Sequence, residues 1–220
     1  QPAPQESFSY SYNESAGPVT LTKRAGEPVD PATLAFSGSA MNETSYGSIT
    51  GWGDNLTAGD KATVAVNPVA AETLNVVWQP SGGGSSSVVA KHDIPRERSG
   101  VYYEQDNGTA GTRATIGTVG THGSPDVTFY AYVYAPTTGE YAVRLTDKNT
   151  AGVQIDGDPV VSGTYGYSTE TNRIHISAGR HRITVTHNLG YRNTLLVEWQ
   201  PPDTGSFTEV PAGHLSPRKP

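Results

Sequence analysis

The chain has 220 residues, which is enough for one large domain or two of ordinary size. Its net charge is −6, and the acidic excess is spread along the chain without any basic cluster, which argues against nucleic acid as a partner. Cysteine is absent, so disulfides cannot report the compartment. Arginine outnumbers lysine by 10 to 5, which in an acidic chain suits a salt-rich habitat.

The composition favours strands along the whole chain. Glycine (25 residues) and proline (16 residues) interrupt it often, and threonine, valine and tyrosine prefer pleated surfaces. No long segment has helical periodicity, so we expect an all-β protein. In the first half the predicted strands are short and almost regularly spaced, as in a β-sandwich. They cover Ser7–Tyr12 and residues 19–23, 33–36, 61–67, 73–78 and 87–91.

A polar segment with a proline, residues 94–100, separates this block of strands from a second one. We therefore expect two β-sandwich domains in tandem, residues 1–95 and residues 96–220.

Residues 127–135 alternate with a period of two. Val127, Phe129, Ala131 and Val133 share one face, which we predict to be core. The other face carries tyrosines at positions 130, 132 and 134. We favour the interpretation that a second sheet or the partner domain covers these rings, since buried strands are often apolar on both faces. The alternative is a stacking platform for a sugar or another subunit.

The order of strands and tight turns in the second half resembles the PA14 domain. The resemblance rests on Gly100-Val-Tyr-Tyr-Glu, which is similar to the family's opening glycine-to-tyrosine strand, and on residues 127–145, 153–161, 176–185 and 195–202. It implies an all-β module of a kind used mostly for binding, often of sugars, at cell surfaces.

The same resemblance bears on calcium. In Thr146-Asp-Lys-Asn-Thr-Ala-Gly, sugar-binding PA14 adhesins carry adjacent aspartates that hold a calcium ion. Here only Asp147 matches, and Lys148 takes the second position, where a cation would oppose metal binding. Asn149, and in principle Asp156 and Asp158, offer further oxygens, although Asp156-Gly157 suits a hairpin turn. We expect no cofactor, with Asp147 and Asn149 as the calcium candidates.

Two loops carry the candidate ligand contacts. Tyr165 and Tyr167 lie in a glycine-rich loop, Ser162-Gly-Thr-Tyr-Gly-Tyr-Ser, and Tyr191 and Arg192 follow Asn188-Leu-Gly. Exposed aromatic side chains on loops are better binding candidates than those within strands. The alternative for the tyrosine pair is that they cap the end of the sandwich.

About residues 6–95 resemble the soluble β-domain of haloarchaeal type IV pilins. The resemblance rests on residues 17–34, Leu56-Thr-Ala-Gly-Asp-Lys-Ala-Thr-Val, Leu74-Asn-Val-Val-Trp and residues 85–90. It implies a preceding hydrophobic helix that builds a filament from copies of the subunit, so any membrane contact would come through a segment absent from this chain. The start, Gln1-Pro-Ala-Pro, leads us to expect a cleaved leader or a missing N-terminal segment.

Four Asn-x-Ser/Thr sequons stand in turn-like contexts, at Asn13, Asn42, Asn55 and Asn107. Such sequons also arise by chance in surface loops rich in serine and threonine. Together they favour an exported, glycosylated protein.

No catalytic motif stands out, and we expect no enzyme activity. The sequence has no HExxH, no G-x-S-x-G and no phosphate-binding loop. His181 and His187 fall on one face of a predicted strand, roughly 20 Å apart, so they cannot ligate one metal ion together.

The sequence thus predicts an extracellular archaeal pilus or cell-surface subunit that mediates adhesion, with its PA14-like module displayed outward to bind glycans. One alternative is a purely structural filament subunit, assembled through the missing helix or by adding the strand Ser7–Tyr12 to a neighbour's sheet. Another is an accessory module of a secreted glycan-degrading protein.

Overall fold

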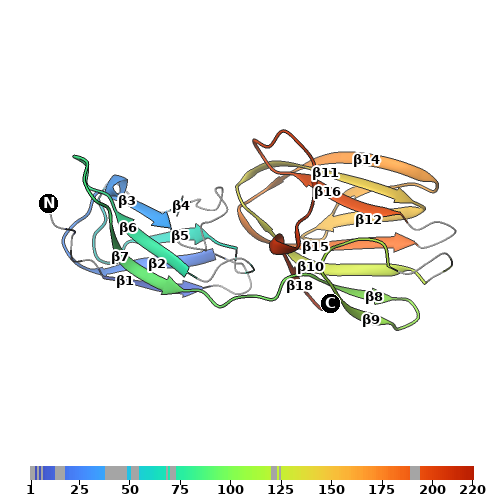
Figure 1. Cartoon of the computed structure of the whole chain (residues 1–220), viewed down its shortest axis with the longest axis horizontal. Coiled ribbons are helices and arrows are strands. Elements are labelled where there is room, and N and C mark those ends of the chain that lie inside the picture. Colours follow the sequence, from blue (N-terminus) through green and yellow to red (C-terminus); the bar gives the residue numbers. More distant parts are fainter. Residues whose placement is uncertain are drawn as a thin grey trace. The chain divides into compact units, whose positions relative to one another are not determined.

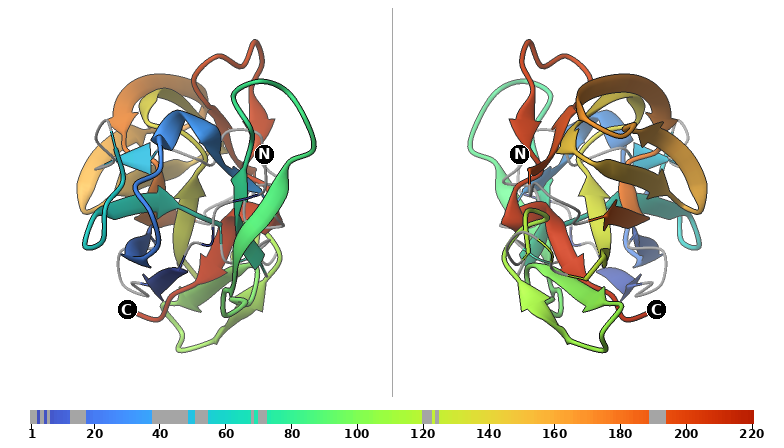
Figure 2. Two further views of the ribbon diagram at one scale, coloured as in Figure 1. Left: turned by 90° about the vertical axis from the view of Figure 1, so that its left-hand side faces the viewer. Right: turned by 90° about the vertical axis from the view of Figure 1, so that its right-hand side faces the viewer.

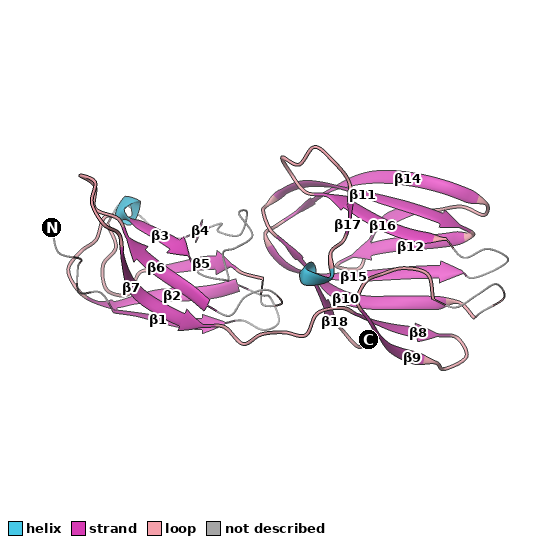
Figure 3. Cartoon of the chain, viewed as in Figure 1, coloured by secondary structure: helices cyan, strands magenta, loops and turns pink. Residues whose placement is uncertain are grey.

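The computed structural model describes residues 3, 5, 7–12, 18–37, 49–50, 55–67, 69, 73–119, 123, 125–188 and 194–220. Strands dominate it, and the helical elements of the described residues are the short 3-10 turns η1 (Pro31–Thr33) and η3 (Ala212–His214) (Figure 3). The prediction of an all-β protein is therefore confirmed. The chain divides into two compact units, Gln1–Arg96 and Glu97–Pro220, next to the boundary expected from the sequence after residue 95.

The first unit is a sandwich of two antiparallel sheets with strand orders β1-β2-β5-β4 and β3-β6-β7 (Figure 1). Its strands are β1 (Ser7–Tyr12), β2 (Pro18–Ala25), β3 (Leu34–Ser37), β4 (Ile49–Thr50), β5 (Lys61–Ala65), β6 (Thr73–Trp78) and β7 (Ser87–Asp93). Alternation along β6 turns Leu74, Val76 and Trp78 into the core, where they join Val19 and Leu21 of β2.

The strand that we considered for donation to a neighbour is used within the chain. All of β1 pairs antiparallel with β2, from Ser7 opposite Ala25 to Tyr12 opposite Val19. Beside it, the Tyr10 hydroxyl donates to the carbonyl of Asp93, which connects β1 to the end of β7 in the other sheet. Among the described strands β1 is an edge of its sheet, so only its outer edge is left to pair with another subunit while β1 stays in place.

The second unit is also a sandwich of two sheets. One has the order β13-β12-β15-β10-β8-β9, with β18 alongside β10, and the other has the order β14-β11-β16-β17. The strands of the first half are β8 (Val101–Gln105), β9 (Ala110–Arg113), β10 (Val127–Ala135), β11 (Gly139–Lys148), β12 (Thr150–Ile155) and β13 (Asp158–Ser162). Those that follow are β14 (Tyr167–Ile176), β15 (Gly179–Asn188), β16 (Leu195–Gln200), β17 (Thr208–Glu209) and β18 (Leu215–Pro217). Figure 2 shows the orange β14 and the green β8–β9 hairpin on different sides of this unit.

The core of the second unit lies between these two sheets. The predicted inward face of β10 is buried at all four positions, including Phe129 and Val133. From the opposite sheet, Tyr141 packs against Trp199 with 5.6 Å between ring centroids. Alternation along β10 therefore predicted the core face correctly.

Candidate functional site

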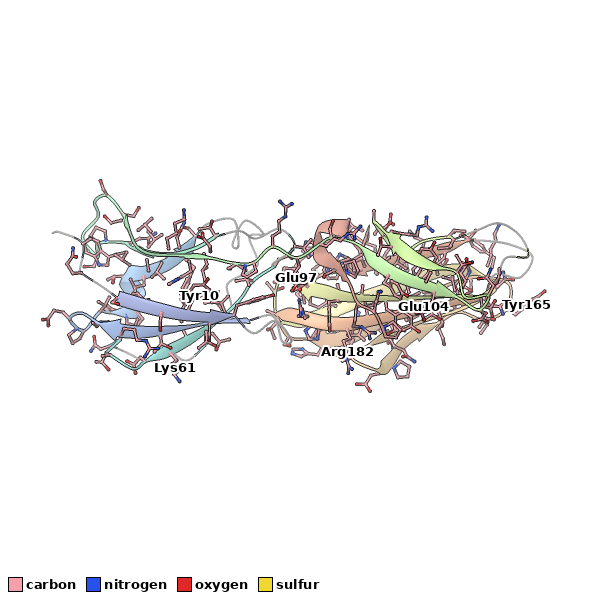
Figure 4. All side chains as sticks on the ribbon, turned by 90° about the horizontal axis from the view of Figure 1, so that it is seen from below. Tyr10, Lys61, Glu97, Glu104, Tyr165 and Arg182 are labelled. Carbon is pink, nitrogen blue, oxygen red and sulfur yellow. The ribbon has the colours of Figure 1, made fainter. Side chains whose placement is uncertain are left out.

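The two tyrosines predicted to contact a ligand stand out from the surface. Tyr165 is 85 % exposed and Tyr167 is 67 % exposed. Tyr165 lies in the turn between β13 and β14, at the end of the second unit opposite Glu97 (Figure 4), and Tyr167 is the first residue of β14. Gly166, between them, has φ of +113°, a backbone conformation that favours glycine. Hence the alternative that these rings cap the sandwich core does not hold for side chains this exposed.

Lys148 lies beside this pair. It is the last residue of β11 and sits opposite Tyr167 in the ladder with β14. Its ammonium nitrogen is 5.5 Å from the centroid of the Tyr167 ring, within the range of a cation–π contact. Its backbone N–H donates to the carbonyl of Thr194 at 3.1 Å, which fixes this end of the strand.

Asp147, the predicted calcium ligand, faces the other way. Adjacent residues of a strand point to opposite faces, and Asp147 is completely buried. The Ser168 hydroxyl donates to one carboxylate oxygen at 2.8 Å, and the Asn149 amide N–H donates to the other at 3.3 Å. A Cβ added to Gly163 would lie 1.9 Å from the first oxygen, so the loop backbone is packed directly on the carboxylate.

This environment does not fit a calcium site. Calcium needs six to eight oxygen ligands, several of them charged. Both oxygens of Asp147 are already in hydrogen bonds, and Asn149, the second candidate, is only 6 % exposed. In the part of the chain that the structure describes, no three histidine, aspartate or glutamate side chains gather closely enough to hold a metal ion.

His187 is a buried polar residue near the same end of the sandwich. It lies between Val127 and Ala151 in neighbouring strands and is 1 % exposed. Neither ring nitrogen has a hydrogen-bond partner among the residues that the structure describes. Burial lowers the pKa of His187, and the negative charges of Asp147 and Asp126 oppose that shift.

We expect His187 to make the protein sensitive to mild acid. The unfolded chain takes up the proton near the ordinary pKa of 6.5, whereas the folded state resists it, so the stability present above that pH falls as the pH drops below it. His187→Leu should weaken this dependence when urea unfolding is compared at about pH 7.5 and about pH 5. The exposed His175 of β14 supplies the control: His175→Gln should keep the wild-type dependence, and a wild-type response in both variants would contradict the assignment.

The other histidine of that strand, His181, anchors a turn instead. Its Nδ1 is 2.7 Å from a carboxylate oxygen of Asp156, and its Nε2 is 2.7 Å from the carbonyl of Ser177. Asp156, mentioned above as a further oxygen ligand for calcium, lies in the β12–β13 turn and binds to His181 and Arg182 of β15. The two histidines serve different local purposes, and they do not share a ligand.

Side chains of the second unit itself cover part of the tyrosine face of β10. The guanidinium of Arg218 lies 5.3 Å from the centroid of the Tyr130 ring, and that of Arg180 lies 4.3 Å from the centroid of Tyr132. Arg218 also donates to the Thr184 hydroxyl at 3.2 Å. The C-terminal residues that follow β18 thus supply much of the cover.

The remaining predicted positions are only partly described. Asn55 and Asn107 are exposed, and the side chain of Asn107 accepts the N–H of Thr109 at 2.9 Å within a turn. Asn13 and Asn42, together with Tyr191 and Arg192, lie outside the described residues. The described part of the chain contains no helix with the length and apolar character needed to cross a membrane.

No protein-family model matches the chain, and no curated protein matches its sequence. Among solved structures, the chain is similar to an anti-sigma factor domain-containing protein, at 14 % identity and a TM-score of 0.52, over 97 % of this chain and 92 % of that one. It is also similar to a PA14 sugar-binding domain from an RTX adhesin, at 19 % identity and a TM-score of 0.37, over 43 % of this chain and 56 % of that one. A third similar structure is the epithelial adhesin 9 A domain from Candida glabrata in complex with Galb1-3GlcNAc. The identity is 10 % and the TM-score 0.39, over 59 % of this chain and 72 % of that one. The first of these agrees with the all-β fold over nearly the whole chain.

Proposed function

We propose that the second unit is a glycan-binding module of an extracellular adhesion protein. The observation that carries this proposal is the pair of exposed rings, Tyr165 in the turn between β13 and β14 and Tyr167 at the start of β14. The turn joins two well-formed strands, and Tyr167 is already held in the ladder with β11, so little conformational freedom would be lost on binding. Aromatic rings present a flat apolar surface together with a polar hydroxyl, which suits the face of a sugar.

Tyr191 and Arg192, predicted from the sequence as ligand contacts, belong to the same proposal. In the sequence they stand between β15 and Thr194, whose carbonyl accepts the N–H of Lys148. Thr194, the first described residue after this segment, therefore contacts the strand that pairs with Tyr167. A single site of this kind would bind weakly, and many copies on one surface would raise the avidity through effective concentration.

The pilus role is the finer part of the proposal. It rests on the resemblance of the first unit to haloarchaeal pilin β-domains, with copies of the subunit as partners, a halophilic source and glycans on the sequons. The structural alternative, a filament subunit that binds no sugar, remains the competing hypothesis. In either case we propose that the chain is not an enzyme. Immunogold microscopy of intact cells tests whether the protein is a filament subunit. Gold along filaments would support the pilus role, and gold on the envelope alone would contradict it.

Removing the two rings tests the glycan-binding proposal directly. Tyr165→Ala combined with Tyr167→Ala should weaken binding to the best ligand of a glycan array about tenfold or more, which corresponds to about 1.4 kcal/mol. The matched control is Val88→Ala, which removes an exposed apolar side chain of the first unit, 58 % exposed. Equal binding by the double variant and the wild type would contradict the assignment, and the lack of any ligand for the wild type would favour the structural alternative.

A further inference from the structure

We propose that the loop site prefers acidic glycans, whose sugars carry a carboxylate or a sulfate, and that Lys148 determines this preference without calcium. The inference rests on the proposed function and names the ligand class of the same site. It follows from the orientation of the last two residues of β11, because the side chain of Asp147 is buried in the sandwich and that of Lys148 lies on its outer face.

The inward residue, Asp147, holds the loop together. Its carboxylate joins three segments of the chain, namely Asn149 after β11, Gly163 after β13 and Ser168 of β14. Because it is fully buried, this carboxylate is not presented to a ligand in solution. The segment with the two tyrosines is therefore held to β11 by hydrogen bonds and packing that the chain supplies itself, as a calcium-independent site requires.

The outward residue, Lys148, presents a positive charge beside the exposed rings. The described residues offer its ammonium no carboxylate within ion-pair distance. Its backbone is held on both sides, by Tyr167 in β14 and by the carbonyl of Thr194. A cation that is stacked on a ring and lacks a carboxylate partner is ready to bind an anionic group.

The ring and the ammonium together match an acidic sugar. A sugar ring can stack on Tyr165 or Tyr167 while its carboxylate or sulfate meets Lys148, forming a charge-assisted hydrogen bond. The chain as a whole is negative, with a net charge of −6, so it gives no general attraction for an anionic polymer. Preference for an acidic glycan should therefore depend on this local cation and weaken with salt.

The experiment compares two oligosaccharides of equal length, an oligogalacturonate and a neutral galactan oligomer, by calorimetric titration of the full chain. Each titration is run with EDTA and again with added calcium. The wild type should bind the acidic oligomer about tenfold more tightly, with no effect of EDTA. Lys148→Met, which keeps the stem and removes the charge, should lose this preference while still binding the neutral oligomer. Lys148→Arg should retain it.

The outcomes separate the inference from the function on which it rests. Binding of the neutral oligomer alone, or acidic binding that EDTA abolishes, overturns the inference and leaves glycan binding intact. Binding of neither oligomer overturns the inference, and the proposed function is overturned as well only when the glycan array also yields no ligand. Poly-glutamate bound as tightly as the oligogalacturonate overturns the glycan specificity, because the site would then recognise any anion. If the melting temperature of Lys148→Met equals that of the wild type, the lost preference for the acidic oligomer is not due to a destabilised fold.

Discussion

We expect Arg180→Met to lower the free energy of unfolding of the second unit by about 3 kcal/mol or more. The side chains of Arg180 and Glu97 form an ion pair that is 6 % and 21 % exposed respectively. Tyr134, fully buried, donates its hydroxyl to Glu97 at 2.6 Å and accepts a hydrogen bond from Arg180 at 2.8 Å. Methionine would fill part of the space but leave the carboxylate largely buried without its cation, and an unpaired buried charge is strongly unfavourable.

The control for this prediction is an exposed pair in the same unit. Arg173 and Glu140 lie 2.9 Å apart, with side chains that are 64 % and 61 % exposed. Since exposed ion pairs contribute little in water, Arg173→Met should change the free energy of unfolding by about 0.5 kcal/mol or less. Differential scanning calorimetry of the full chain measures both variants. Equal costs would show that burial is not what makes the Arg180 pair important.

This cluster was beyond the reach of sequence reasoning. Arg180 and Glu97 are separated by 83 positions, and nothing local to either residue indicates the other. The sequence placed Glu97 in a polar boundary segment, whereas the structure fixes it to β15 within the second unit. Long-range polar contacts depend on sheet order, and sheet order is not encoded in the alternation of any single strand.

Local pattern did predict the strands themselves. Alternation identified Ser7–Tyr12, the buried face of β10 and the strand that ends at Trp78, because a period of two follows from the pleat. The cover on the tyrosine face of β10 was expected, from a second sheet or the partner domain, and Arg180 and Arg218 of the same unit supply part of it. The contact between the Arg218 guanidinium and the Tyr130 ring follows from the register of β18 with β10, which the sequence does not reveal.

The candidate site was likewise predicted only where local sequence pattern was enough, and not where it depends on strand pairing. Loop position and glycine content indicated Tyr165 and Tyr167, and both are exposed. Lys148 was interpreted only as an obstacle to calcium, since its stacking on Tyr167 depends on the pairing of β11 with β14. Alternation alone would have shown that Asp147 and Lys148 point to opposite faces, which was the available signal.

The close approach of Gly163 to Asp147 leads to the second large effect. Gly163→Ala should lower the free energy of unfolding by about 3 kcal/mol, the upper end for overpacking, because the new methyl group would lie 1.9 Å from a carboxylate oxygen. The carboxylate cannot move aside easily, since it is fully buried and bonded to Ser168. In addition, the Gly163 N–H donates to the carbonyl of Ala151 at 2.9 Å, so this hydrogen bond to β12 restrains the backbone of Gly163 from moving away from Asp147.

A double-mutant cycle with Asp147→Ala tests whether this contact is the cause. Gly205→Ala is the control in the same unit, because nothing lies within 4 Å of the added Cβ there, and we expect it to change stability by about 0.5 kcal/mol or less. Asp147→Ala alone should destabilise the protein, since it leaves Ser168 and Asn149 without their acceptor. Once the carboxylate is gone the methyl group at position 163 has room, so Gly163→Ala should cost much less in the Asp147→Ala background. An equal cost in both backgrounds would mean that the clash with Asp147 does not determine the requirement for glycine, and that the loop is fixed by its backbone alone.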